Sequence, residues 1–365
     1  MSIERVLIKR NDIAQCRVAH APMQGLTQGE VLVRVGDFAL TANNISYAVA
    51  GERIGYWQFF PVDAEWGVVP VWGFGDVIES QCDDLPVGAR FWGFLPMASH
   101  VVMRPGRVSA RGFVDTSDHR AALPPVYNQY ALTANDPAEL AAMADARSLL
   151  FPLLTTSYLI ADYLADMVMF GAEQVIIGSA SSKTGFGTAH FVGALLDRPA
   201  TITGLTSAGN LAFTTGLGLY DKVVLYGDVD SLDASVPTVY VDMSGDSAVL
   251  AAVHHHFGDN IKASIGVGAT HWEAPRLREA LPGAAPAFFF APSQIQKRDA
   301  EWGAGEMMRR ATIANMAFVV ALGDQLTITH RYGAQAVAEA YRGLVAGTTP
   351  PTAGLILGFG EESAG

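Results

Sequence analysis

The chain of 365 residues is long enough for two domains, and its 50% apolar and 16% charged residues are typical of a compact globular protein, not of a disordered one. Its net charge is -12 and its lysines and arginines form no cluster, which argues against nucleic acid or an anionic membrane surface as a partner. Cys16 and Cys82 belong to no Cys-x-x-Cys pair and to no metal-spaced set, so we expect no disulfide framework and a cytoplasmic protein.

The first 125 residues are rich in short strands and turns. Residues 1–10 alternate between apolar and charged side chains, which indicates a strand and not a signal peptide. The pattern predicts further strands at residues 31–35, 68–72, 74–78 and 86–92. Residues 51–60 follow no strand pattern and are rich in aromatic side chains, so we expect a loop there.

Helical periodicity then covers residues 138–168. The most apolar stretch of the chain, residues 149–170, lies largely within it. Pro152, Asp162 and Asp166 interrupt this stretch, and such interruptions argue against a membrane span.

Residues 172–226 are the centre of the pattern, because strands and helices alternate there. A β-branched run at residues 175–177 leads through small and polar residues into a helix, and strand, helix and strand follow at residues 200–206, 210–217 and 221–226. This order predicts a parallel sheet with right-handed crossovers. The first strand-to-helix turn of such a unit gathers backbone N–H groups and the positive end of a helix dipole, where a pyrophosphate binds.

The rest of the chain continues the alternation. We expect strands at residues 238–242, 262–268 and 287–290, with a helix at residues 248–257. A helix at residues 334–345 and a closing strand at residues 353–358 complete the chain.

The turn at residues 179–185, Ser-Ala-Ser-Ser-Lys-Thr-Gly, and the order of elements around it resemble the medium-chain dehydrogenase/reductase superfamily on its zinc-free, quinone-oxidoreductase-like side. The superfamily usually has Gly-Ala-x-Gly-Gly-Val-Gly there, so the chain resembles a divergent branch that keeps the last glycine. The resemblance implies an α/β fold: a Rossmann-like doubly wound parallel sheet over residues 146–324, and a GroES-like β-barrel domain over residues 1–145, completed by about residues 325–365.

The resemblance also implies NADP(H) as cofactor. Hydroxyl and backbone N–H groups of the turn would hold the pyrophosphate. The residues expected to supply them are Ser179, Ser182, Lys183, Thr184 and Gly185. The same residues also suit a plain helix cap. The end of the second strand lacks an acid that would repel a 2′-phosphate. The residues expected around that phosphate are Thr206, Ser207, Asn210 and Tyr226, with Lys183 as a positive charge. Gly268 matches a turn that presents backbone to the carboxamide in relatives.

Residues 42–47 match the segment in which zinc alcohol dehydrogenases carry a cysteine, and they contain no Cys, His or Glu. We therefore expect catalysis without a metal. In zinc-free relatives an Asn and a Tyr of this turn face the nicotinamide, which implies Asn44 as polariser and Tyr47 as proton donor, with Ser46 beside them. Each also has a structural explanation, asparagine as a turn former and tyrosine as core packing.

The expected function is that of an NADPH-dependent, zinc-independent oxidoreductase that transfers hydride to an enone, quinone or ketone. Tyr56, Trp57, His271 and Trp272 are expected to line a site for a flat, hydrophobic substrate, although aromatic density is also typical of a β-domain core. Two alternatives remain open: an enzyme without redox cofactor that cleaves carbon–carbon bonds or hydrolyses its substrate, and a non-catalytic binding protein. The resemblance also implies a homodimer, because members of the superfamily commonly pair edge strands of the nucleotide-binding domain. The apolar strand at residues 287–290 carries no charge that would prevent such pairing.

Overall fold

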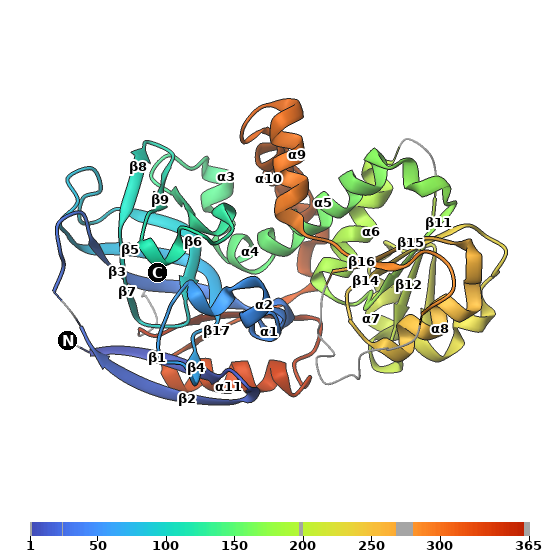
Figure 1. Ribbon diagram of the computed structural model, residues 1–365, viewed down its shortest axis with the longest axis horizontal. Helices are drawn as coiled ribbons and strands as arrows, with labels where there is room; N and C mark the ends of the chain where they lie inside the picture. Colours follow the sequence, from blue (N-terminus) through green and yellow to red (C-terminus); the bar gives the residue numbers. More distant parts are fainter. Residues whose placement is uncertain (1, 24, 197–199, 268–279, 361–365) are drawn as a thin grey trace. The chain divides into compact units, whose positions relative to one another are not determined.

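The computed structural model describes residues 2–23, 25–196, 200–267 and 280–360 of the chain. They fall into two compact units (Figure 1). Unit 1 consists of Met1–Leu149 together with Leu326–Gly365, and unit 2 of Leu150–Gln325.

Unit 1 is built mainly of antiparallel strands. Among its described residues, a small sheet has the order β2-β1-β4, and a large sheet has the order β17-β18-β3-β5-β6-β10-β9-β8, with β7 paired to β3. The strands are β1 (Ser2–Lys9), β2 (Asp12–Pro22), β3 (Val31–Leu40), β4 (Trp66–Gly67), β5 (Pro70–Ser80), β6 (Arg90–Pro96), β7 (His100–Met103), β8 (Pro105–Ser109), β9 (Gly112–Asp115), β10 (Gln129–Leu132), β17 (Thr327–Tyr332) and β18 (Ala353–Gly358).

Short helices connect the strands of unit 1. They are α1 (Ala42–Val49), α2 (Gly51–Ile54), α3 (Ala138–Ala141), α4 (Ala144–Leu149) and α11 (Ala334–Val345), with 3₁₀ turns η1 (Tyr56–Gln58), η2 (Asp118–Arg120) and η3 (Pro125–Asn128). The closing strand β18 pairs antiparallel with β3, so the end of the chain completes the sheet that its beginning started.

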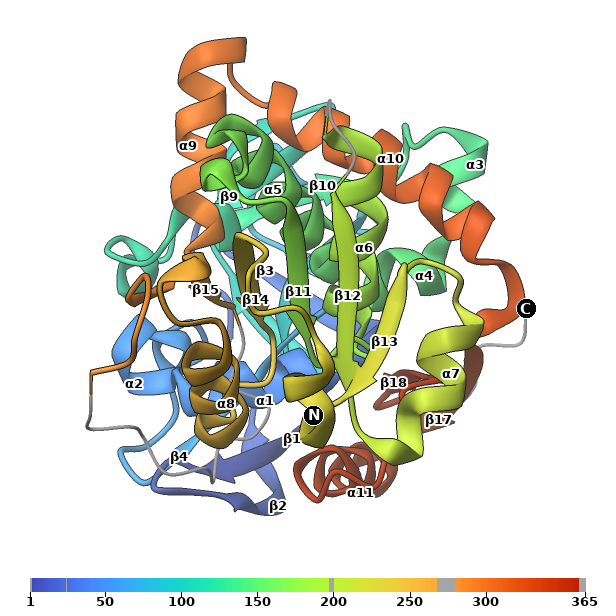
Figure 2. The same cartoon turned by 90° about the vertical axis from the view of Figure 1, so that its right-hand side faces the viewer.

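Unit 2 contains a parallel sheet in the order β13-β12-β11-β14-β15-β16. Figure 2 shows β11 in the middle of this sheet, between β12 and β14. The strands are β11 (Gln174–Gly178), β12 (Thr201–Thr206), β13 (Lys222–Leu225), β14 (Thr238–Asp242), β15 (Ile261–Gly266) and β16 (Pro286–Phe288). The helices are α5 (Phe151–Asp166), α6 (Lys183–Leu195), α7 (Leu211–Gly216), α8 (Ser247–Phe257), α9 (Ala291–Trp302) and α10 (Glu306–Leu322).

The central strands of unit 2 are apolar because both of their faces are covered. Val175, Ile176 and Ile177 are fully buried, as parallel strands between two helical layers must be. Ile176 belongs to a core cluster that also includes Leu205 of β12 and Val253 of α8. The expected parallel sheet is confirmed.

Other expectations need correction. The strands expected at residues 68–72 and 74–78 are joined in one strand, β5, which begins at Pro70. Gly73 does not interrupt this strand. It lets the neighbouring backbone come close, since a Cβ there would lie 2.5 Å from the Asp37 carbonyl oxygen. Residues 42–47 are not a turn but most of helix α1, and residues 51–60 contain α2 and η1 and not an extended loop.

Candidate active site

The turn that follows β11 lies at the point where the strand order of unit 2 reverses. From β11 the chain continues to β12 and β13 on one side, and then crosses to β14, β15 and β16 on the other. Ligands of open parallel sheets bind at the carboxyl ends of the strands at such a reversal. Residues 179–182 are therefore placed where an anionic cofactor binds in sheets of this kind.

Side chains of neighbouring elements hold this turn. Ser179 has a φ of 53°, a left-handed conformation that favours glycine, and Tyr226 hydrogen-bonds to both its side chain and its backbone. The Tyr220 hydroxyl donates to the Ala180 carbonyl oxygen at 2.7 Å, and the Asn210 amide donates to Ser181 Oγ at 3.1 Å. These contacts stabilise a turn in which Ser179, Ser182 and Lys183 stand at the three positions where the pattern of the resemblance has glycine.

The retained glycine has a steric reason. A Cβ on Gly185 would lie 2.6 Å from the Ser179 carbonyl oxygen and 2.9 Å from Ser182 Oγ. Ser182 is the N-cap of α6, and its hydroxyl oxygen accepts the Gly185 N–H. The cap explanation of Ser182 is thus correct, and it is compatible with anion binding at the same helix end.

Lys183 and Thr184 form the first turn of α6. Burial lowers the pKa of Lys183 to about 8, because its half-buried ammonium group is partly removed from water. The Thr184 carbonyl oxygen accepts hydrogen bonds from Ser157 Oγ of α5 and from Thr188 Oγ1. An anion beside Lys183 would restore the charge that burial disfavours.

Of the other residues expected to bind the cofactor, some contact the turn and others do not. Asn210 and Tyr226 contact the turn as described, whereas Thr206 is fully buried and its hydroxyl accepts from Thr214 Oγ1 at 3.4 Å. Ser207 follows β12 and is exposed. Gly268, His271 and Trp272 lie outside the described residues. Ser181, which belongs to this turn and accepts from Asn210, and Tyr220, which donates to it, were missed, since their roles depend on contacts between distant segments.

In unit 1, Tyr47 is buried on helix α1 and its hydroxyl oxygen accepts the Trp72 Nε1–H at 3.2 Å. Burial raises the pKa of Tyr47, while Trp72 and Asn43 act in the opposite direction as hydrogen-bond partners. The phenol therefore stays protonated at neutral pH. Asn43 was missed because residues 42–47 were expected to form a turn; on a helix, residues four apart share a face.

Asn44 instead caps helix α1. Its side-chain oxygen accepts the Thr41 backbone N–H at 2.8 Å, and its amide nitrogen donates to the Pro70 carbonyl oxygen at 2.8 Å. These contacts make Asn44 a structural residue, so Asn43 takes its place beside the Tyr47 hydroxyl. Ser46 is half-buried on the same helix.

Six aromatic residues of unit 1 form what we call the aromatic cluster, with Phe94 packed against the rings of Tyr47, Trp72 and Tyr127 at 5.5, 5.2 and 4.6 Å. Its members are Tyr47, Tyr56, Trp72, Trp92, Phe94 and Tyr127. Trp57 is not a member, since it is 1% exposed and fills the space above Gly51 and Gly67. Trp57 is therefore a core residue and not a substrate contact, and Tyr56 stays the predicted substrate contact.

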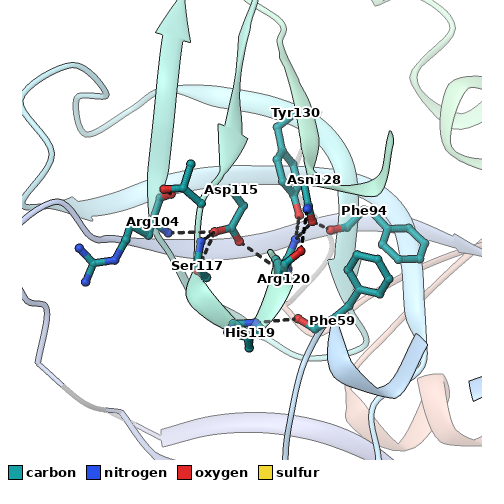
Figure 3. A network of polar contacts seen from close by, with 10 residues as sticks. Phe59, Phe94, Arg104, Asp115, Ser117, His119, Arg120, Asn128 and Tyr130 are labelled. Carbon is teal, nitrogen blue, oxygen red and sulfur yellow. Dashed lines mark hydrogen bonds and ion pairs between the residues drawn. The ribbon is translucent and has the colours of Figure 1, made fainter. Parts of the chain in front are cut away.

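A buried polar network anchors this cluster (Figure 3). Asp115 pairs with Arg120 at 3.2 Å, and Arg120 donates to the Tyr130 hydroxyl at 2.8 Å. Tyr130 in turn donates to the Phe94 carbonyl oxygen at 2.6 Å. His119 Nε2 lies 3.3 Å from the Phe59 carbonyl oxygen. Burial raises the pKa of Tyr130 to about 12, so it remains a donor, and the network fixes the strand that carries Phe94.

Among the described residues, no three His, Cys, Asp or Glu side chains are grouped as a metal ion requires. No helix in the described ranges is both long and apolar enough to cross a membrane.

Comparison with known proteins shows the family of the chain. A family model described as "Protein of unknown function (DUF2855)" matches residues 38–350. The chain belongs to the DUF2855 family. No curated protein matches its sequence.

Solved structures resemble this DUF2855 protein over nearly its whole length. CurA from Vibrio vulnificus in complex with NADPH is 11% identical with a TM-score of 0.61, covering 98% of this chain and 99% of that one. A mutant enoyl thioester reductase from Candida tropicalis is 12% identical with a TM-score of 0.57, covering 98% and 100%. An Etr1p mutant in complex with NADP and crotonyl-CoA is 12% identical with a TM-score of 0.56, covering 98% and 100%.

At these identities the likeness is one of fold. It confirms the expected fold class, a Rossmann-like parallel sheet with a GroES-like β-barrel domain.

Proposed function

We propose that this protein is an NADPH-dependent, zinc-independent oxidoreductase that transfers hydride to a hydrophobic or aromatic enone, quinone or ketone. The single observation that carries the proposal is the turn at residues 179–185, capped by Ser182 at the strand reversal of a parallel sheet. Structures of the same fold bind NADPH in CurA and NADP with crotonyl-CoA in Etr1p, which supports it.

NADPH rather than NADH follows from the end of β12. Residues 206–210 contain no Asp or Glu to bind a ribose 2′-hydroxyl and repel a phosphate. Ser207 and the Asn210 amide offer hydrogen bonds there, and Lys183 offers a positive charge within the neighbouring turn.

Bound NADPH supplies a hydride to the electron-poor carbon of the substrate. The chain must then stabilise and protonate the resulting oxyanion or enolate, and Tyr47 is the proposed donor, because its oxygen accepts the Trp72 N–H and that bond does not use its own hydrogen. No metal is required in this scheme, since residues 42–47 provide no thiolate, imidazole or glutamate.

The test is NADPH consumption, followed by absorbance, with an α,β-unsaturated ketone, a 1,4-quinone and a simple ketone. We expect turnover with at least one conjugated acceptor. Saturable NADPH binding without turnover of any acceptor would favour a binding protein, and absence of NADPH binding would favour a scaffold without redox cofactor.

We also propose a cytoplasmic homodimer. β16 lies at one edge of the described sheet in unit 2, opposite β13, and its Phe288 is 54% exposed. An apolar edge strand without a guarding charge is suited to pair with a second copy.

A further inference from the structure

Three tyrosines of the aromatic cluster, Tyr47, Tyr56 and Tyr127, are in mutual contact. Tyr56 and Tyr127 share a hydrogen bond of 3.0 Å between their hydroxyl oxygens, and the rings of Tyr47 and Tyr56 lie 4.6 Å apart. Burial raises the pKa of all three phenols, and a neighbour in the group raises each further: Tyr127 that of Tyr47, Tyr47 that of Tyr56, and Tyr56 that of Tyr127. The three phenols are therefore close neighbours, and all are neutral donors at physiological pH.

This group has more donors than acceptors. The Tyr56–Tyr127 pair holds two hydroxyl hydrogens and its shared bond uses one, and no described residue accepts the other. The Tyr47 oxygen accepts the Trp72 N–H, so that bond does not use the Tyr47 hydrogen, and Asn43 is the other hydrogen-bond partner of this hydroxyl. Trp92 Nε1 is buried and has no hydrogen-bond partner among the described residues. Buried donors without acceptors are costly, and a ligand with a strong acceptor removes that cost.

The surroundings favour a flat ligand. Trp72 and Trp92 stack at 4.7 Å with a 24° angle between their planes, and both remain partly exposed, as does Tyr127. The Arg147 guanidinium lies 5.0 Å from the Trp92 ring centre and pairs with Asp136. Arg120, paired with Asp115, lies 5.6 Å from the Phe59 ring centre. An aromatic surface with surplus donors suits a planar conjugated oxyanion.

We propose that Tyr47 and the Tyr56–Tyr127 pair bind the oxygen of a planar conjugated oxyanion, such as an enolate or a phenolate, against Trp72 and Trp92. The inference deepens the proposed function, because such an oxyanion is what hydride addition to an enone or quinone produces. Tyr127 is then a residue that contacts the substrate oxygen, in addition to Tyr47.

The experiment is binding of 4-nitrophenol to the full-length protein without any nicotinamide, followed by the absorbance of its phenolate across pH. The wild-type site should bind the phenolate in preference to the neutral phenol, so that the bound ligand titrates at a lower pH than the free one. 4-Nitroanisole has the same ring but no ionisable oxygen and serves as the neutral ligand. A bound nitrophenol that titrates at the same or a higher pH, or no binding at all, overturns the proposal.

Variants then locate the site. Tyr127→Phe and Tyr47→Phe should each weaken nitrophenolate binding by roughly 10- to 100-fold, the usual loss for a hydrogen bond to a charged group, and leave 4-nitroanisole binding near wild type. Tyr341→Phe is the matched control, since Tyr341 is buried in the same unit and donates to the Ile13 carbonyl oxygen. Equal losses for both ligands, or none, refute the hydroxyl site. Because NADPH is absent, failure here is distinguishable from failure of the proposed cofactor.

Discussion

Lys183→Met should weaken NADPH binding and abolish its dependence on alkaline pH. In the free protein the pKa of Lys183 is about 8 instead of the ordinary 10.5, because burial disfavours the ammonium form. A phosphate beside it favours that form and raises the pKa again. Binding above about pH 8 therefore takes up a proton, and affinity falls as pH rises from about 8 towards 10.5.

The size of the effect follows from that pKa. Full recovery of the pKa from about 8 to 10.5 corresponds to about 3.4 kcal/mol, and solvent screening at this half-buried position reduces the gain. We expect about 1–2 kcal/mol, or roughly a 5- to 30-fold loss of NADPH affinity in Lys183→Met. NADH should lose less if Lys183 contacts the 2′-phosphate.

The assay is isothermal titration calorimetry at pH 7 and pH 9, in two buffers of different ionisation enthalpy. Wild type should show proton uptake at pH 9 and Lys183→Met should not. Lys222→Met, which removes an exposed lysine of β13, is the matched control. A pH-independent wild-type affinity, or proton uptake that persists in Lys183→Met, would refute the role of Lys183. Equal losses for NADPH and NADH would move the contact to the pyrophosphate.

Other changes test the remaining parts of the account. Gly185→Ala should abolish NADPH binding and lower the free energy of unfolding by about 1–3 kcal/mol, because its Cβ would lie 2.6 Å from a carbonyl oxygen. Gly193→Ala in the same helix should do neither, because its Cβ would lie 3.7 Å from Ile202. Denaturant titration measures the stability of both variants. Tyr47→Phe should slow the reductive step by roughly 10²–10⁴ in single-turnover kinetics with NADPH affinity unchanged, and a normal rate would assign the proton to water. Dialysis against a chelator should leave activity unchanged, whereas a loss that zinc restores contradicts the metal-free scheme. Sedimentation at micromolar concentration should give a dimer, and a monomer would exclude the proposed β16 pairing.

The arrangement of unit 2 could be predicted well because its signals are local. The β-branched run at residues 175–177 is buried on both faces, and the strand at residues 238–242 has the bounds of β14. Strand β17 and helices α9 and α10 were not predicted. β17 consists mainly of exposed residues and lacks the alternation that marks a half-buried strand.

The site was harder to predict because its contacts join distant segments. The superfamily pattern identified the turn, but not that Tyr220 and Asn210 would support it from beyond β12. Asn44 and Tyr47 were selected together as parts of a turn, whereas the helix of residues 42–49 makes Asn44 a cap and brings Asn43 to Tyr47. The Tyr56–Tyr127 bond spans 71 residues, and no sequence pattern signals it.

The most direct test of the central claim is a crystal structure of the protein soaked with NADPH. The account predicts electron density for the dinucleotide with its pyrophosphate on residues 179–185, at the N-terminal end of α6, and its 2′-phosphate within reach of Ser207, Asn210 or Lys183. Absence of density at saturating NADPH, or a dinucleotide bound away from this turn, would contradict it.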